Sequence, residues 1–249
     1  MEKVLKNQIK LSDMFLRGEM ETDEKIRQKL KEEVVECYKE NKVAEELIKQ
    51  FIIHNNQVEN FVIRFSKEEN FNDKEKEIAI LSAIFHDIAK GYGDFLKHGE
   101  VGGEMAEKIL LKKGISKELA KSVKLAIERH MGVQGYPTEK AKKQYGKKFE
   151  FPEYATKVGQ IVYECDILTQ LTEEGFDKIL LLRELDKEDF QEDKKKVKED
   201  KKIIEQIRIL SVLKSAKKSY NLIKLESVKK EAEKLWQKIQ EKYGMYNEK

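Results

Sequence analysis

Apolar residues recur every three or four positions along most of the chain, which is the spacing of one face of an α-helix. The run from Ile78 to Ala89 is apolar almost all round, which predicts a buried central helix ending at Gly91 and Gly93. Ser116 is the predicted N-cap of a later helix. The full set of predicted helical segments is 1–50 (more than one helix), 44–65, 78–89, 99–111, 116–130, 155–171, 175–185 and one or two helices over 203–243.

Residues 131–156 interrupt this pattern and form the longest predicted loop. They contain both prolines of the chain, Pro137 and Pro152, and three of its 13 glycines. Average usage of about 5% proline would place about 12 prolines in a chain of this length. So few helix breakers favour long helices over a β fold with many turns. The predicted fold class is therefore all-α, a helical bundle with additional N- and C-terminal helices.

Charge and hydropathy divide the chain into three predicted parts. These are an N-terminal helical extension over 1–43, a core over 44–185 and a charged C-terminal helical extension over 186–249. The last part opens with the dense charge run DKEDFQEDKKKVKEDKK. Residues 183–249 contain 19 basic and 14 acidic residues, a net charge of +5. We interpret this charge as a solvated helical face, and the alternative is a weak patch for phosphates.

The composition excludes several other classes of protein. The 50 basic and 47 acidic residues nearly balance, so the net charge of +3 does not by itself indicate a nucleic-acid binder. Two cysteines 128 residues apart, Cys37 and Cys165, do not form a disulfide framework. The longest apolar run, Ile78 to Phe85, is far below the roughly 18 residues that span a bilayer, and the N-terminus lacks an apolar signal core. We therefore expect a soluble protein of the cytoplasm without a membrane partner.

The four histidines carry the strongest chemical signal. All four, His54, His86, His98 and His130, lie on apolar stripes of different predicted helices. A buried imidazole needs partners for both ring nitrogens. If the four rings face one another, binding a metal ion satisfies that need.

Two aspartates accompany the histidines. Asp87 follows His86 directly, and Asp166 lies within the apolar segment IVYECDILTQL. A buried carboxylate is costly unless it is paired or ligates a cation. Each residue alone is unremarkable, since single histidines and aspartates often serve as core or capping residues. Taken in order, the six residues supply six nitrogen and oxygen ligands, so we predict one coupled metal site.

This ordered set resembles the HD-domain superfamily of metal-dependent phosphohydrolases. The matching motifs are His54, the doublet in FHDIAK, His98 in KHGEVGG, His130 in ERH and Asp166 in YECD, spread over about residues 44–175. The resemblance implies an all-α core, in agreement with the composition. It also implies that His54, His86, Asp87 and Asp166 ligate a first metal ion. His98 and His130 would ligate a second ion, with Asp87 as the bridge.

Mixed imidazole and carboxylate ligation suits Fe, Mn, Co, Ni or Zn better than Mg. Two such ions about 4 Å apart activate a water molecule near pH 7 and neutralise charge on phosphoryl oxygens. Cys165 is interpreted as a small buried residue because its side chain points about 100° away from that of Asp166 on a helix.

Four further residues are candidates for catalysis or substrate binding. Lys90 either complements the dipole of a helix end or clamps the substrate phosphate, as the Lys of HDxxK often does in the family. Asp87 and Lys90 are the predicted catalytic residues. Arg129, Tyr136 and Lys143 are the other candidate substrate residues. The last two lie in a loop rich in lysine and aromatic residues, which suits a nucleotide base and its phosphates, although an ordinary solvated loop has the same composition.

The expected function is a metal-dependent phosphohydrolase of the phosphatase, phosphodiesterase or nucleotide pyrophosphohydrolase type. It would cleave a phosphoester or phosphoanhydride bond of a small nucleotide-type substrate with a metal-activated water. The ligand order also resembles bacterial HD hydrolases that split diadenosine tetraphosphate symmetrically, although the long loop and the C-terminal extension differ. Alternatives are a di-iron HD oxygenase, a non-catalytic nucleotide sensor and an HD nuclease, for which nucleic acid would be the partner.

Overall fold

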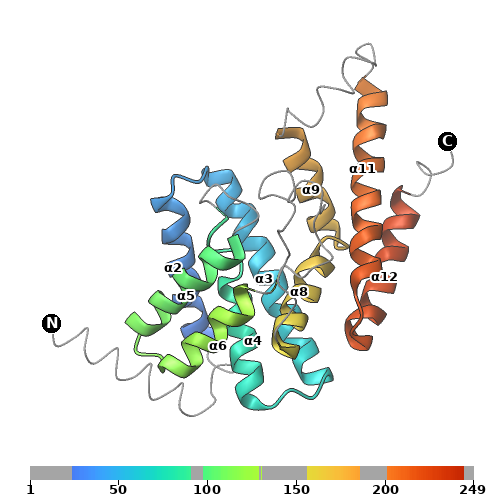
Figure 1. The fold of residues 1–249 in the computed structure, drawn as a ribbon. Helices are drawn as coiled ribbons and strands as arrows, with labels where there is room; N and C mark the ends of the chain where they lie inside the picture. The colour runs from blue at the N-terminus through green and yellow to red at the C-terminus, as the bar shows by residue number, and fades with distance from the viewer. Residues whose placement is uncertain (1–23, 91–97, 129, 131–155, 186–200, 244–249) are drawn as a thin grey trace, which may run out of the picture. The chain divides into compact units, whose positions relative to one another are not determined.

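The computed structural model describes residues 24–90, 98–128, 130, 156–185 and 201–243 (Figure 1). Within these ranges every regular element is an α-helix, which confirms the predicted all-α class. The helices are α2 (Glu24–Glu40), α3 (Glu45–Glu68), α4 (Asp73–Phe85), α5 (His98–Lys112), α6 (Lys117–Glu128), α8 (Lys157–Thr169), α9 (Glu173–Leu185), α11 (Lys201–Leu222) and α12 (Glu226–Tyr243). None of the helices in the described ranges is long and apolar enough to span a bilayer.

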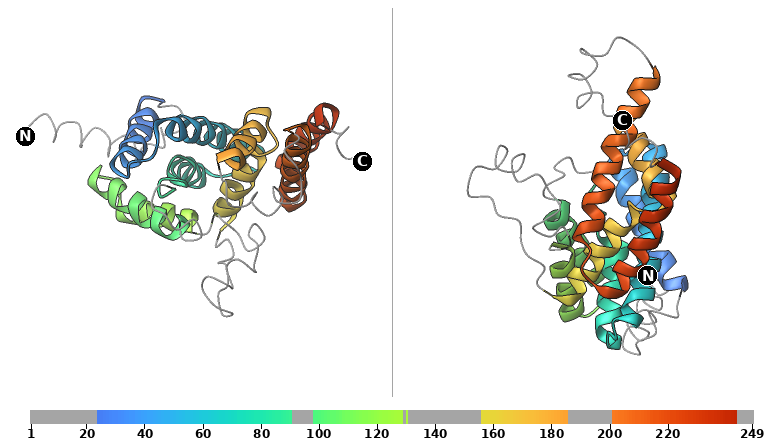
Figure 2. Two further views of the ribbon diagram at one scale, coloured as in Figure 1. Left: turned by 90° about the horizontal axis from the view of Figure 1, so that it is seen from above. Right: turned by 90° about the vertical axis from the view of Figure 1, so that its right-hand side faces the viewer.

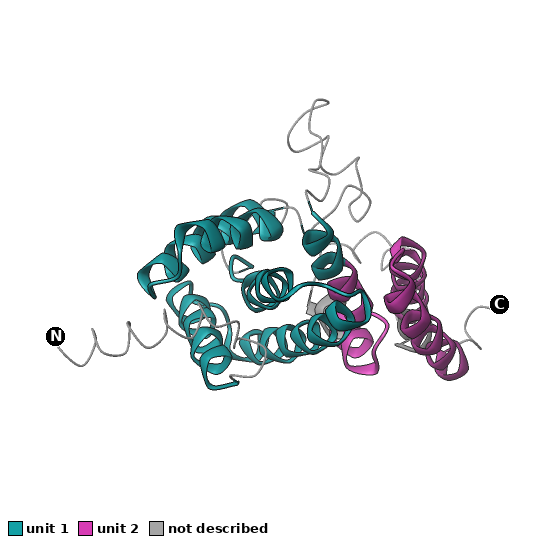
Figure 3. Cartoon of the chain, turned by 90° about the horizontal axis from the view of Figure 1, so that it is seen from below, with its two compact units in different colours: residues 1–163 teal, residues 164–249 magenta. Residues whose placement is uncertain are grey.

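The chain forms two compact units, residues 1–163 and 164–249 (Figure 3). The boundary falls inside α8, so the first turns of this helix belong to one unit and its last turns to the other. The divisions predicted at residues 43 and 185 stay predictions.

Helix α4 is the centre of the first unit. It packs against α2, α3, α5 and α6, and both the view from above and the view from below show it enclosed by these helices (Figures 2 and 3). Its residues from Ala79 to Phe85 are all buried, together with Phe65 of α3 and Ile127 of α6. Because the run from Ile78 to Phe85 is apolar almost all round, neighbouring helices can cover it on every side, as the sequence predicts.

Local signals set the beginnings of the central helices. The Asn72 side chain accepts a hydrogen bond from the main-chain N–H of Glu75, whose carboxylate accepts one from the N–H of Asn72. This reciprocal capping box begins α4. The Ser116 hydroxyl likewise accepts from the N–H of Leu119 at 3.2 Å, which confirms the predicted cap of α6.

The predicted continuation of the central helix to Ala89 is wrong. The α-helix ends at Phe85, and residues 86–90 form consecutive turns. The N–H of Ile88 donates to the carbonyl of Phe85, and the N–H of Lys90 donates to that of Asp87. These bonds span three residues instead of four, so the chain tightens after Phe85. The His86–Asp87 doublet therefore stands at a helix end rather than in a helix interior.

A buried ion cluster joins α2 to α3. Glu59 of α3 is only 2% exposed. Its carboxylate pairs with the Arg27 guanidinium at 2.8 Å and with the Lys31 ammonium, both from α2. A buried carboxylate held by two cations links the helices strongly, because removal of either side leaves an uncompensated charge.

The second unit contains the end of α8 with α9, α11 and α12. Helix α11 packs against α9 and α12, and Phe176 of α9 stacks on Tyr243 of α12 with ring centroids 4.6 Å apart. The buried Glu164 carboxylate accepts from the main-chain N–H of Leu225 at 2.8 Å, at the start of α12. An anion at this position satisfies a helix N-terminus.

The C-terminal segment predicted as one or two helices is two helices, α11 and α12. In α12, the predicted positions Val228, Ala232 and Ile239 are buried. In α11, the apolar spacing of the sequence includes Ile207, Leu210 and Leu213, of which Leu213 is buried and the other two are only half-buried. The buried positions of this helix are Ile209, Val212, Leu213, Ala216 and Ser219. Helix α11 has apolar residues on several faces, so spacing alone finds only part of the buried face.

Candidate metal centre

Four helices of the first unit bring five predicted ligands to one place. His54 lies in the third turn of α3, His86 and Asp87 follow the end of α4, His98 begins α5 and His130 follows the end of α6. All five side chains are buried, with exposed fractions between 0 and 5%. They form two groups of possible ligands that share Asp87, one with His54 and His86 and the other with His98 and His130.

The first group is tight. The Nε2 atoms of His54 and His86 lie 3.1 and 3.2 Å from Asp87 Oδ2, and 3.3 Å from each other. Ligand atoms that share a cation at bond lengths near 2.1 Å are roughly 3.0–3.4 Å apart. The three atoms therefore already have the mutual spacing of a coordination sphere.

The second group is wider. The Nε2 atom of His98 lies 3.6 Å from Asp87 Oδ1, and the ring centroids of His98 and His130 are 5.2 Å apart. Within this group the ligand atoms lie within 4.8 Å of one another. Asp87 Oδ1 is buried and accepts no hydrogen bond from the described residues. A buried carboxylate oxygen without a donor is the kind of atom that a cation satisfies.

Main-chain carbonyls orient two of the imidazoles. Nδ1 of His86 donates to the carbonyl of Ala83 at 2.8 Å, and Nδ1 of His130 donates to that of Ile127. With Nδ1 bonded in this way, each ring turns its Nε2 toward the site, where loss of the Nε2 proton would leave a lone pair for a metal ion. This second hydrogen bond is the usual way in which proteins hold a metal-binding histidine.

The ionised form of the Asp87 carboxyl group is stabilised by its neighbours. Burial alone would raise the pKa of this carboxyl, but the charges of His86 and Lys90 and hydrogen bonds from His54 and His86 hold it well below its usual value. The carboxylate therefore stays ionised and available as a ligand.

Lys90 is part of this cluster. Its ammonium pairs with Asp87 Oδ2 and lies 5.9 Å from the centroid of the Phe51 ring. The suggested role in complementing the dipole of a helix ending at Gly91 does not apply, because α4 ends at Phe85, five residues before Lys90.

The residues present fit a divalent metal ion. Four imidazoles and one carboxylate are the donor set that Fe, Mn, Co, Ni and Zn accept, and the shared Asp87 lies between both groups. His54 and His86 with Asp87 would hold one ion, and His98 and His130 with the same carboxylate would hold another.

Asp166 is described as a half-buried residue in the last turn of α8, in the second unit. Neither group of possible ligands found among the described residues includes it. Its role as a ligand stays a prediction.

The candidate substrate residues Arg129, Tyr136 and Lys143 lie outside the described residues. Cys165 is fully buried, as predicted, and burial raises the pKa of its thiol well above the usual value.

Sequence reasoning missed two residues that support the main chain of the His86–Asp87 doublet. The Tyr38 hydroxyl, buried in α2, donates to the main-chain carbonyl of Asp87 at 3.1 Å, and Nδ2 of Asn55 donates to that hydroxyl at 3.4 Å. The only signal was position: Asn55 follows His54, and Tyr38 lies four residues after Val34 on an apolar stripe. These residues fix the main chain at Asp87.

In sequence, short stretches of this chain are similar to known proteins. The bifunctional uridylyltransferase/uridylyl-removing enzyme of Vibrio atlanticus (strain LGP32) is 37% identical over 79 residues, which are 27% of this chain and 9% of that enzyme. The enzyme of the same name from Vibrio cholerae serotype O1 is 41% identical over 58 residues, 23% of this chain and 6% of that enzyme. The chain thus matches less than a tenth of the length of these relatives.

A solved structure extends the likeness to the fold. The crystal structure of a predicted HD superfamily hydrolase from an uncultured Thermotogales bacterium superposes with a TM-score of 0.50 and 15% identity, over 86% of this chain and 90% of that one. The HD domain family model matches residues 51–171, a range that contains all six predicted ligands. With the ordered motifs and the helical fold, this match places the chain in the HD-domain family.

Proposed function

We propose that this protein is a metal-dependent phosphohydrolase that cleaves a phosphoester or phosphoanhydride bond of a small nucleotide-type substrate. The single observation that carries the proposal is the convergence of His54, His86, Asp87, His98 and His130 into two buried groups that share Asp87. Divalent ions bound there would supply an activated water and positive charge for the phosphoryl oxygens.

The residues of the chain have distinct parts in this proposal. Asp87 holds its negative charge between both groups, and its main chain is fixed by Tyr38. The carbonyls of Ala83 and Ile127 keep two imidazoles turned toward the site. The Lys90 ammonium, at the edge of the cluster, is the group placed to bind a phosphate oxygen, since it is still 16% exposed. A cation in this position favours the charge that develops in phosphoryl transfer.

The relatives favour a nucleotidyl phosphodiester as one substrate to test. Their name includes removal of a uridylyl group, and a uridylyl group is attached through a phosphoester. The substrate panel therefore includes the p-nitrophenyl ester of UMP beside p-nitrophenyl phosphate, nucleoside mono-, di- and triphosphates, dinucleoside polyphosphates and a single-stranded oligonucleotide.

The experiment compares metal-free protein with protein loaded with Mn²⁺, Fe²⁺, Co²⁺, Ni²⁺ or Zn²⁺. We expect turnover of at least one panel member by a loaded form, and a loss of about 10³-fold or more in the isosteric variant Asp87→Asn. The matched control is Asp73→Asn, an exposed carboxylate in the first turn of α4, which should keep full activity.

Full metal occupancy without turnover of any phosphorylated compound would overturn the proposal. Oxygen consumption that depends on reduced iron would instead favour the di-iron oxygenase. Cleavage confined to the oligonucleotide would favour the nuclease.

A further inference from the structure

The main chain of Asp87 is held by a helix that lies outside the matched HD domain. Tyr38 belongs to α2, which ends before residue 51, where the match to the HD domain begins. Its hydroxyl donates to the main-chain carbonyl of Asp87 at 3.1 Å, and the same carbonyl accepts from the N–H of Lys90 at 2.9 Å. A carbonyl oxygen has two acceptor positions, and both are occupied here. The orientation of the peptide group that follows Asp87 is therefore fixed.

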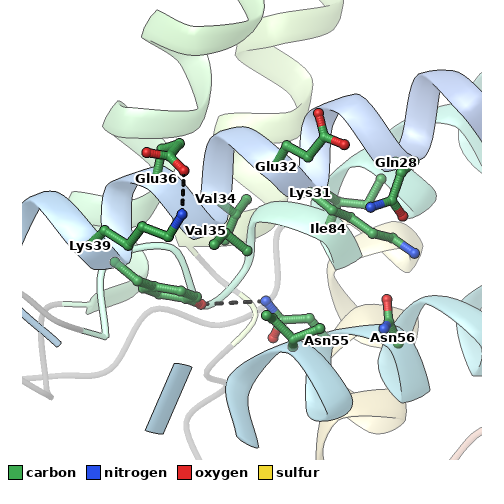
Figure 4. A pocket seen from close by; sticks show the side chains of 12 residues that line it. Gln28, Lys31, Glu32, Val34, Val35, Glu36, Lys39, Asn55, Asn56 and Ile84 are labelled. Carbon is green, nitrogen blue, oxygen red and sulfur yellow. Dashed lines mark hydrogen bonds and ion pairs between the residues drawn. The ribbon is translucent and has the colours of Figure 1, made fainter. Parts of the chain in front are cut away.

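Asn55 of α3 fixes the position of the hydroxyl itself. Because the hydroxyl donates its one proton to Asp87, it can only accept from Nδ2 of Asn55, at 3.4 Å. Figure 4 marks this bond with the dashed line at Asn55. Tyr38 is 1% exposed and Asn55 is 7% exposed. Loss of either hydrogen bond would leave a buried polar atom unsatisfied.

Packing alone does not determine where the Tyr38 hydroxyl lies. Phe51, one turn before Asn55 on α3, contacts the Tyr38 ring with centroids 5.3 Å apart. Elsewhere a cavity of about 270 Å³ lies between α2 and α3, and Tyr38, Asn55 and Ile84 are among the residues that line it (Figure 4). Empty space beside a side chain removes the contacts that would hold it on that side. The position of the hydroxyl therefore depends on its two hydrogen bonds.

These hydrogen bonds join the two elements that carry the first group of ligands. Asn55 directly follows His54 on α3, and Asp87 follows the end of α4. The pair thus links the main chain at one ligand to the main chain at the other. His54 Nε2 and Asp87 Oδ2 lie 3.1 Å apart. A metal site tolerates errors of only about 0.2 Å in its ligand distances, so a small shift of α3 against Asp87 would matter.

From these contacts we infer that Tyr38 and Asn55 are positioning residues of the metal centre. They set the placement of His54 relative to Asp87, and thereby the affinity and the ligand geometry of the ion bound there. Helix α2 then belongs to the metal centre, although it precedes the matched domain. The inference rests on the metal centre of the proposed function but requires no hydrolysis, so metal binding alone tests it.

The test is calorimetric titration of the metal-free full chain with Co²⁺, together with the visible absorption spectrum of the Co²⁺-loaded protein. The substitution Tyr38→Phe removes only the hydroxyl oxygen. Loss of a partner behind a ligand typically weakens metal binding about 10–100-fold, and we expect a loss in this range. The absorption bands should also change, because their position and intensity report the geometry of the ligands.

A packing variant of the same helix separates positioning from stability. Leu30 is buried on α2, two turns before Tyr38. The substitution Leu30→Ala lowers stability through lost packing but keeps both hydrogen bonds. Because distant sites without shared partners act independently, its Co²⁺ affinity should stay within about twofold of that of the parent. Its absorption spectrum should match that of the parent.

A double variant tests whether the two residues act as one unit. The substitution Asn55→Leu removes the donor to the hydroxyl. It should weaken Co²⁺ binding less than Tyr38→Phe does, since the bond from Tyr38 to Asp87 remains. If Asn55 acts through Tyr38, the variant with both substitutions should bind Co²⁺ within about twofold of Tyr38→Phe alone.

Three results would overturn the inference and leave the proposed function standing. These are parent affinity and spectrum in Tyr38→Phe, a loss of affinity in Leu30→Ala as large as in Tyr38→Phe, and additive losses in the double variant. A parent protein that binds neither Co²⁺ nor any of the other four metals would overturn the metal centre, and the proposed function with it.

Discussion

At the scale of single residues, the polar side chains around Asp87 define the candidate metal centre. The carboxylate touches His54, His86 and Lys90, while its main-chain carbonyl accepts from Tyr38. Since all of these groups except the partly exposed Lys90 ammonium are buried, they depend on one another for their hydrogen bonds. Changes here should therefore show in stability as well as in activity.

The substitution Tyr38→Phe tests whether the Tyr38 hydroxyl supports the main chain of the His86–Asp87 doublet. Loss of the hydroxyl leaves the Asp87 carbonyl and the Asn55 amide without this partner, which should lower the free energy of unfolding by about 1–3 kcal/mol. Urea denaturation of both proteins measures the difference. The control Tyr220→Phe removes a hydroxyl that makes no hydrogen bond among the described residues. Its free energy of unfolding should stay within about 0.5 kcal/mol of that of the parent. Equal stability of the two variants would contradict the structural role.

Glu77 should make stability depend on pH. Burial raises the pKa of this α4 carboxyl from 4.5 to about 7, and Oε1 has no hydrogen-bond partner among the described residues. Between these two values the folded protein binds more protons than the unfolded chain, so its stability falls as pH rises from about 4.5 through 7. Glu77→Gln should remove this loss and stabilise the protein by about 1–3 kcal/mol at pH 8, with little effect at pH 4.5.

Urea midpoints at both pH values measure this effect. The control Glu45→Gln alters an exposed carboxylate of α3 and should leave the pH dependence unchanged. A Glu77→Gln variant with the parent's pH dependence would show that Glu77 ionises normally.

At the scale of elements, small residues decide how α5 meets α6. The sequence pattern predicts that His98 shares a stripe with Val101, Met105 and Ile109, but these three are only half-buried. The buried face consists of Gly99, Gly102, Gly103, Ala106 and Leu110. Spacing rules favour large apolar residues, whereas close helix packing selects small ones, and only the packed structure distinguishes these faces.

Gly103→Ala should disturb this contact. A Cβ atom there would lie 2.9 Å from the main-chain oxygen of Lys124, so α5 and α6 would have to separate. We expect a loss of about 1–3 kcal/mol in stability, although alanine is the better helix former. Gly102→Ala is the control, because its nearest neighbours are 3.5–3.6 Å away, an ordinary contact. Thermal denaturation should rank Gly102→Ala above Gly103→Ala, and the reverse order would refute the packing argument.

At the scale of the whole molecule, ligands gathered from four helices couple metal binding to folding. The unfolded chain does not hold His54, Asp87 and His130 together, so a metal ion that binds this cluster stabilises the folded state. At 100 times its dissociation constant, the ion should add about 2.7 kcal/mol. We expect Mn²⁺ to raise the Tm and a chelator to reverse the change.

The comparison of Asp87→Asn with Asp73→Asn checks the origin of this stabilisation. The first variant should lose the metal-dependent rise in Tm, and the second should retain it. A parent protein whose Tm does not respond to any of the five metals would argue against a metal centre.

The sequence by itself determined the helical class, most helix positions and the candidate metal ligands, five of which converge in the structure. Helical periodicity is a local property, and six histidines and aspartates in order form a pattern that can be read without coordinates. The HD-domain family follows from the same residues and is confirmed by the match over residues 51–171.

Only the tertiary structure decided how these residues meet. It placed the end of α4 at Phe85, directed Lys90 onto Asp87, and brought Tyr38 and Asn55 behind the doublet. It also opened a cavity beside α2 and selected the buried faces of α5 and α11. The physical reason is that hydrogen bonds and packing between helices depend on long-range contacts, and local spacing along the chain does not contain them.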